Sequence, residues 1–99
     1  MKPLKVGGLA ALEFREAVRW YEERRPGWGS KLFDAIAHAT DLVRAHPEIG
    51  EARKGRLPSR KLRVPGFPYY VVYRIREGDI YVVAIAHTSR RPGYWRDRR

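Results

Sequence analysis

The sequence contains no cysteine among its 99 residues. A disulfide scaffold, a cysteine-ligated zinc site and a cysteine nucleophile are therefore excluded, and the absence fits a reducing compartment such as the cytoplasm. The sequence also lacks an apolar run of the roughly 18 residues that a membrane span requires. Its first residues are basic and apolar, but they include two glycines and precede a charged segment at 13–16. We therefore expect neither a signal peptide nor a membrane partner.

Acidic residues are scarce in the second half of the chain. Residues 51–99 contain 13 Lys or Arg and only 4 Asp or Glu, whereas residues 1–50 contain 8 and 7. The net charge of +10 thus belongs almost entirely to the C-terminal half. A segregated positive field favours an anionic partner. Nucleic acid, an acidic protein segment and an anionic membrane surface all fit the charge by itself, and of these we do not expect the membrane. The alternative is charge that serves solubility alone, although solubility does not require segregation.

Hydrophobic residues make up 43% of the chain and aromatic residues 12%. This content excludes a disordered chain, which is poor in aromatic and β-branched residues. We find no internal repeat and no linker long enough to divide domains. The length therefore predicts a single domain over residues 1–99.

The first half of the sequence predicts two helices, over residues 10–25 and 28–45. In the first helix Phe14, Ala17, Val18 and Tyr21 follow the helical spacing, and the second helix continues the pattern from Trp28 to Val43. The opposite face of the first helix, which includes Glu13, is expected to be solvated. Pro26-Gly27 ends the first helix and Pro47 ends the second. Because the link between them is short, the two helices should form an antiparallel hairpin.

The second half of the sequence changes to a period of two and predicts strands at 60–64, 68–75 and 79–87. Residues 76–79 form the turn between the last two strands, and Gly78 is expected to supply a positive φ. The last strand is apolar on both faces over Val82–Ala86, which indicates a central strand. Residues 2–8 predict either a short edge strand or a loose arm, because Pro3 suits an edge.

Together these elements predict an α+β fold, in which a two-helix antiparallel hairpin packs on a small antiparallel β-sheet. The expected core consists of Leu62, Val64, Val71, Tyr73, Ile80, Val82 and Ala84 or their alternates. Strand register is the least constrained part of this prediction, because a slip of one residue exchanges the two faces.

The sequence gives no support for a metal or cofactor site. The three histidines, His38, His46 and His87, have no metal-ligand spacing and no accompanying carboxylate cluster. No glycine-rich phosphate loop with its Lys-Ser/Thr is present, and no nucleophile elbow surrounds a serine. We therefore expect no metal and no cofactor.

Basic and aromatic residues gather in two segments that should border the same sheet. We expect a target-binding surface made of Arg60, Lys61, Arg63, His87, Arg90, Arg91, Tyr94 and Trp95. Arginine makes bidentate contacts with phosphate or carboxylate, and Tyr and Trp provide flat faces for stacking. The alternative for Tyr94 and Trp95 is that they fold back onto the sheet as a lid over the core.

Several segments in order resemble the RelE/ParE superfamily of type II toxins. They are Ala45-His46-Pro47-Glu48-Ile49-Gly50, the stretch from Phe67 to Arg74, and the ending from Ala86 to Trp95. The resemblance spans residues 12–95, and it is strongest to the ParE branch, which is associated with plasmid stabilisation. It implies a cytosolic bacterial protein and a cognate, ParD-like antitoxin encoded beside it.

The resemblance implies two candidate activities. ParE-like toxins bind and poison DNA gyrase, which is inhibition without catalysis, whereas RelE-like toxins are ribosome-dependent endoribonucleases that cut mRNA. Cleavage through the 2′-hydroxyl needs a base, a positive charge and an acid, yet no Asp, Glu or His occurs from Ala52 to Arg76. We therefore favour gyrase as the target and assign no catalytic residue. In the ribonuclease alternative, His87, Arg63 and Tyr94 would carry the chemistry, and a third alternative is the same fold with another or lost activity.

Overall fold

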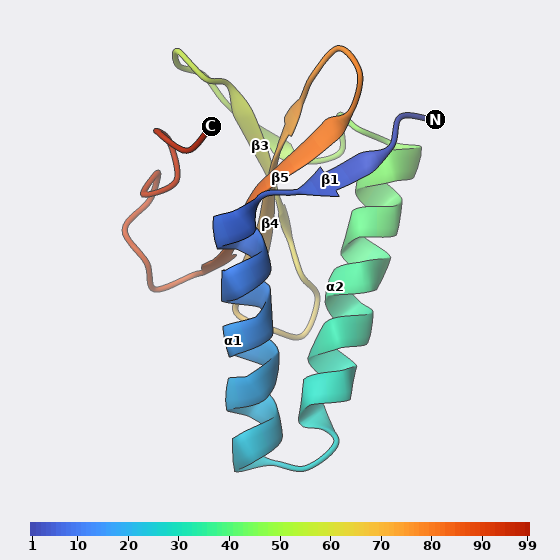
Figure 1. Ribbon diagram of the computed structural model, residues 1–99, viewed down its shortest axis with the longest axis vertical. Coiled ribbons are helices and arrows are strands. Elements are labelled where there is room, and N and C mark those ends of the chain that lie inside the picture. The colour runs from blue at the N-terminus through green and yellow to red at the C-terminus, as the bar shows by residue number, and fades with distance from the viewer.

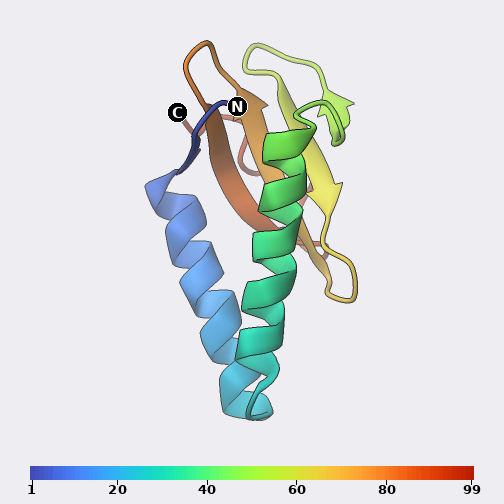
Figure 2. The same ribbon diagram turned by 90° about the vertical axis from the view of Figure 1, so that its right-hand side faces the viewer.

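Two antiparallel helices form one layer and a five-stranded sheet forms the other in the computed structural model, which describes residues 1–99 (Figure 1). The elements in chain order are β1 (Leu4–Val6), α1 (Gly8–Arg24), α2 (Trp28–Ala45), β2 (Glu51–Arg53), β3 (Ser59–Arg63), β4 (Tyr69–Ile75) and β5 (Ile80–His87). The predicted α+β architecture is confirmed. The helical hairpin extends beyond the sheet at the end that carries the α1–α2 turn (Figure 2).

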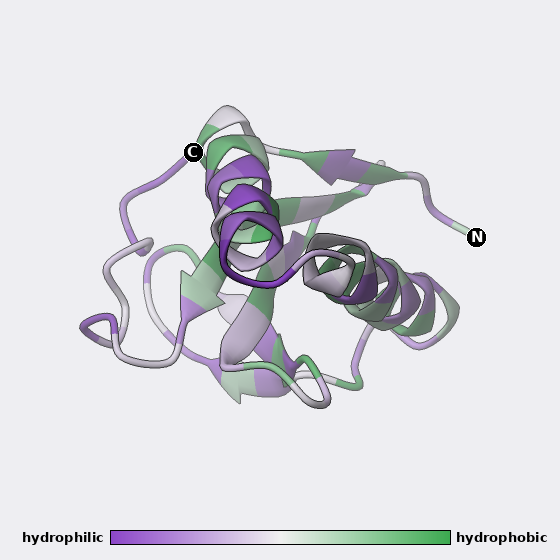
Figure 3. Ribbon diagram, turned by 90° about the horizontal axis from the view of Figure 1, so that it is seen from below, coloured by the Kyte–Doolittle hydropathy of each residue, from purple (hydrophilic) through white to green (hydrophobic).

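The helices have the amphipathic character that their sequences indicate. Seen end-on, both carry apolar and polar segments in alternation (Figure 3), and Ala10, Ala17, Leu32 and Ile36 bury their side chains in the core. The start of α2 is capped from α1, because the Glu22 carboxylate accepts hydrogen bonds from the N–H groups of Gly27 and Gly29 at 3.0–3.1 Å. This cap fixes how the two helices meet.

The sheet has the order β1-β5-β4-β3-β2. β1 pairs with β5 in parallel, and the other pairs are antiparallel. Of the two alternatives for residues 2–8, the edge strand is the one observed, at residues 4–6, and β5 is an inner strand as its apolar character indicated. β2 was not predicted from the sequence, because its three exposed residues carry no alternating apolar pattern.

An irregularity between β4 and β5 changes which side chains of β5 face the helices. Val72 pairs with Ala84 and Tyr73 pairs with Val82, so β5 has one extra residue at this point. Such a bulge lets two successive side chains point to the same face. Val83 and Ala84 both pack on the face away from the helices, and Ile85 returns to the helical side. Ala84 is buried as expected, but it belongs to the apolar cluster on the outer face and not to the core under the helices.

The remaining predicted core positions agree with the structure in most cases. Val64, Val71, Tyr73, Ile80 and Val82 are buried under the helices, and Leu62 packs against them while partly exposed. One expectation about the β4–β5 turn fails, since Gly78 has no positive φ. The turn is instead closed by Arg76, whose guanidinium donates to the Asp79 carboxylate at 2.6 and 2.7 Å.

A candidate binding surface around the C-terminal segment

The C-terminal segment, residues 88–99, lies against the outer face of the sheet, opposite the helices. The Trp95 side chain is only 5% exposed and packs with Val72, Val83, Ala84 and Ala86. Its indole N–H lies 3.4 Å from the Ser59 hydroxyl. Of the two sequence-based alternatives for Trp95, the lid over the core is the one observed, so its ring does not face outward.

Side chains of the sheet also hold the main chain of this segment. The guanidinium of Arg74, buried in β4, donates to the carbonyl oxygens of Arg96 and Arg98. The Tyr81 hydroxyl donates to the carbonyl of Arg99 at 3.2 Å. Burial lowers the pKa of Arg74, yet a guanidinium stays protonated at all physiological pH values. The segment is therefore fixed to the sheet by its backbone as well as by Trp95.

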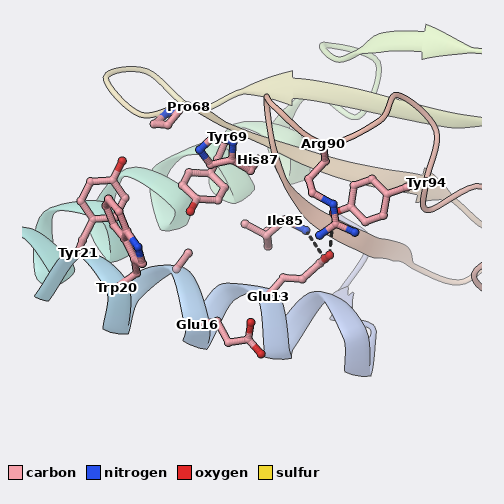
Figure 4. Close-up of a pocket in the computed structure, with 11 residues that line it drawn as sticks. Glu13, Glu16, Trp20, Tyr21, Pro68, Tyr69, Ile85, His87, Arg90 and Tyr94 are labelled. Carbon is pink, nitrogen blue, oxygen red and sulfur yellow. Dashed lines mark hydrogen bonds between the residues drawn. The ribbon is translucent and has the colours of Figure 1, made fainter. Parts of the chain in front are cut away.

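Glu13 links the C-terminal segment to the first helix. Its carboxylate accepts hydrogen bonds from the Tyr94 hydroxyl at 2.7 Å, from the Ile85 N–H at 3.1 Å and from both terminal nitrogens of Arg98 at 2.9 and 3.1 Å. Figure 4 shows the carboxylate between Ile85 and Tyr94. The expectation that Glu13 is solvated is wrong, and its spacing gave the signal, because position 13 lies between buried Ala10 and Ala17 on one helical face.

Tyr94 is partly buried beneath two arginines. The Arg90 guanidinium lies 4.0 Å from the centre of the Tyr94 ring and that of Arg98 lies 5.0 Å away. Burial, followed by the hydrogen bond to the Glu13 carboxylate, raises the pKa of Tyr94 well above its usual value. The hydroxyl is therefore a protonated donor that is already engaged, and Arg90 stacks on the ring at the surface.

The three basic residues predicted on β3 do not act together. Arg60 is on the helical side of the sheet, where it donates to the carbonyl oxygens of Glu48 and Gly50 at 3.1 and 2.8 Å. Lys61 and Arg63 are on the outer face beside Tyr70, with their charged groups 4.6 and 5.8 Å from its ring centre. Two of the three residues thus remain on the outer face.

His87 ends β5 and borders two cavities. One cavity, of about 490 Å³, lies between α1 and the C-terminal segment, with Trp20, Tyr21 and Tyr69 at one end and Arg90 and Tyr94 at the other (Figure 4). The other, of about 340 Å³, opens on the outer face, and its lining includes Lys61, Tyr70 and Arg90. The His87 imidazole stacks edge-on against Tyr69, and its Nδ1 accepts the Ser89 N–H at 3.0 Å.

The structure contains neither a cluster of metal ligands nor a membrane-spanning helix. Nowhere do three or more His, Asp or Glu side chains come together as metal ligands would. Neither helix is long and apolar enough to cross a membrane.

Comparison with known proteins identifies the family. The family described as the ParE toxin of the type II toxin-antitoxin system, parDE, matches residues 5–92. A solved structure, the chromosomal ParDE TA system from P. aeruginosa, has a TM-score of 0.76 at 20% sequence identity over 90% of this chain and 98% of that chain. No curated protein matches the chain. With its two-helix hairpin on a mostly antiparallel sheet and a family match over nearly its whole length, the chain belongs to the ParE toxin family of type II toxin-antitoxin systems.

Proposed function

We propose that this toxin acts by binding DNA gyrase and that it does not cleave RNA. The observation that carries the proposal is the dispersal of the groups that cleavage would use. Tyr94 borders the cavity beside α1, whereas Arg63 lies beside Tyr70 on the outer face, and of these three groups only His87 borders the cavities on both sides. A phosphodiester can be cut only where its acid, base and positive charge converge.

The state of Tyr94 supports the same conclusion. A general base must lose its proton and a general acid must present one to the leaving group. The Tyr94 proton is donated to Glu13 at 2.7 Å, and the raised pKa of Tyr94 disfavours the phenolate. Tyr94 therefore serves as a platform for Arg90 rather than as a proton carrier.

The proposed gyrase-binding surface consists of exposed arginines at the start of the C-terminal segment together with Lys61 and Arg63 on the outer face. Arg90 and Arg91 are exposed, and the following residues are fixed to the sheet. A rigid platform that presents arginines loses little conformational entropy on binding, and arginine is among the residues that dominate interface energies. Trp95 and Arg60 are not part of this surface, because Trp95 is buried and Arg60 lies on the opposite, helical side of the sheet.

The decisive experiment places purified toxin in two assays. We expect inhibition of gyrase supercoiling with accumulation of cleaved plasmid, and no cutting of mRNA in a translation extract. Replacement of Arg90 and Arg91 together by Ala should abolish the inhibition, whereas replacement of Arg15 and Arg19, exposed on α1, should not. His87→Gln should weaken inhibition less than tenfold, but it would reduce RNA cleavage by about 100-fold if His87 were its acid or base. Cut mRNA with intact gyrase activity would refute the proposal.

We further propose that a cognate antitoxin neutralises the toxin by covering apolar side chains on the helical hairpin. Leu9, Leu12, Trp20 and Phe33 are between 42 and 54% exposed, and positions 9, 12 and 20 share one face of α1. An antitoxin segment would bury these side chains with its apolar residues, and its acidic residues would pair with the excess of Arg and Lys in the C-terminal half of the chain. Replacing Leu9 and Leu12 by Ser should release a co-expressed antitoxin during purification, while gyrase inhibition by the free toxin should persist.

A further inference from the structure

We propose that Glu13 is a positioning residue for the proposed gyrase-binding surface. Glu13 holds the C-terminal segment, and with it the arginines of that surface, in place. The inference rests on the proposed function, because it concerns the segment that carries Arg90 and Arg91. Glu13 is on α1, yet its carboxylate receives hydrogen bonds from residues more than 70 positions away in sequence. No other acidic side chain of the molecule contacts the C-terminal segment through a hydrogen bond or ion pair.

The Glu13–Arg98 ion pair lies at the edge of β5. β1 pairs with β5 only as far as Val82, so the rest of β5 has no neighbouring strand on that side. Arg98 donates to the Val83 carbonyl at 3.1 Å and Glu13 accepts the Ile85 N–H at 3.1 Å. The two side chains thereby satisfy main-chain groups that another strand would pair. The pair is largely buried, with 18% and 17% of the two side chains exposed.

The ion pair is connected to Arg90 through the side chain of Tyr94. The same carboxylate fixes the Tyr94 hydroxyl at 2.7 Å, and the Tyr94 ring supports the Arg90 guanidinium at 4.0 Å. If the carboxylate loses its charge, Arg98 loses its counter-ion and Tyr94 keeps only a weaker acceptor. The stacking surface under Arg90 is then no longer held in one position. Glu13 thus acts on the target through Arg98 and Tyr94 without touching the target itself.

The experiment compares Glu13→Gln with Glu23→Gln, which makes the same change at an exposed position of the same helix. Hydrogen–deuterium exchange, followed by mass spectrometry, reports each segment separately. We expect Glu13→Gln to accelerate exchange of the amides in residues 90–99 by about tenfold or more, because charge-assisted hydrogen bonds are lost. The amides of β4 should exchange as in the unaltered protein, which separates release of the segment from global unfolding. Glu23→Gln should leave amide exchange unchanged both in residues 90–99 and in β4.

The functional arm measures the concentration of toxin that half-inhibits gyrase. Glu13→Gln should raise this concentration about tenfold at an unchanged folded fraction, and antitoxin binding should remain. Tyr94→Phe removes a single hydrogen bond and is the second variant should Glu13→Gln fold poorly, and it should raise the concentration in the same direction. In the double variant Glu13→Gln/Arg98→Gln the second substitution should add little, because both residues belong to one interaction.

Each outcome decides a separate question. Unchanged exchange of residues 90–99 in Glu13→Gln would overturn the inference, as would faster exchange with unchanged gyrase inhibition. If the unaltered toxin fails to inhibit gyrase, the proposed function fails. In that case, amide exchange and growth inhibition, each compared between Glu13→Gln and Glu23→Gln, would still decide whether Glu13 positions the C-terminal segment.

Discussion

At the scale of single residues, the structure depends on side chains that bind main-chain groups far away in sequence. The Tyr73 hydroxyl accepts the Gly50 N–H at 2.9 Å and donates to the Pro47 carbonyl at 2.6 Å, which fixes the segment after α2. The Arg74 guanidinium fixes the C-terminal segment by donating to the main-chain carbonyl oxygens of Arg96 and Arg98. Such residues stabilise the fold through contacts that no local sequence pattern reveals.

Trp95 tests whether the C-terminal segment is part of the core. Trp95→Ala should lower the free energy of unfolding by about 3–5 kcal/mol, since it leaves a cavity over the outer face of the sheet. Trp20→Ala is the control, because Trp20 is half-exposed, and it should cost less than about 1 kcal/mol. Urea denaturation measures both values. Equal, small losses would show that the segment does not pack on the sheet.

Asp79 provides a pH-dependent contribution to stability. The hydrogen bonds from Arg76 hold the pKa of Asp79 below its usual value of 3.8, so the folded state favours the ionised carboxylate. The stabilisation is complete above the unfolded pKa and is lost as the pH falls through the lower, folded pKa. Asp79→Asn should therefore lower the melting temperature at pH 6, and the difference from the unaltered protein should shrink toward pH 2. A difference that stays constant over this range would contradict the ion-pair account.

At the scale of elements, the helical hairpin depends on a close contact at the end that carries the α1–α2 turn. A Cβ atom on Gly29 would lie 2.9 Å from the Glu22 Cβ and from the Val18 carbonyl oxygen. The absence of a side chain at position 29 therefore lets α2 start against α1. The same contact leaves room for the Glu22 cap, so packing and capping are achieved by the same few residues.

Gly29→Ala tests this contact. We expect a loss of about 1–3 kcal/mol in unfolding free energy, because the helices must move apart. Gly8→Ala makes the same substitution in α1, where nothing lies within 4 Å of the new methyl group, and it should be neutral or stabilising by up to about 1 kcal/mol. Thermal and urea unfolding distinguish the two variants. A destabilising effect of Gly8→Ala as large as that of Gly29→Ala would refute the steric explanation.

The C-terminal segment is also an element whose role the structure redefines. The sequence alone suggests that residues 90–99 could be removed from a folded protein to test toxicity. Because Trp95 is buried and Arg98 pairs with Glu13, such a truncation would also uncover the outer face of the sheet. Substitution of Arg90 and Arg91 tests the proposed gyrase-binding surface without this loss of packing.

At the scale of the whole molecule, the net charge of +10 is the dominant long-range property. It should accelerate encounter with an acidic antitoxin, because opposite charges attract over a distance that salt reduces. We expect the association rate to fall by about tenfold or more between low salt and about 0.5 M salt. The dissociation rate should change much less, because it depends on short-range contacts. Stopped-flow or surface-binding kinetics measure both, and a salt-independent association rate would refute electrostatic steering.

The sequence by itself determined the two helices, the three long strands and the architecture that they form, but not β2. Periods of 3.6 and two, with Pro and Gly between them, gave both helices, the three long strands and the inner position of β5. These features could be predicted because they depend on local spacing and on burial of an apolar face. The segments that resemble RelE/ParE toxins also indicated the family that the chain belongs to.

Only the tertiary structure decided which residues form the candidate site. The bulge in β5 sends Ala84 to the outer face, the sheet buries Trp95, and Arg60 turns to the helical side. The spacing of Glu13 places it on the buried face of α1, but its partners at residues 85, 94 and 98 are defined only by the tertiary structure. Local patterns cannot encode such contacts, because they join segments more than 70 residues apart and exist only once the sheet, helix and C-terminal segment have packed together.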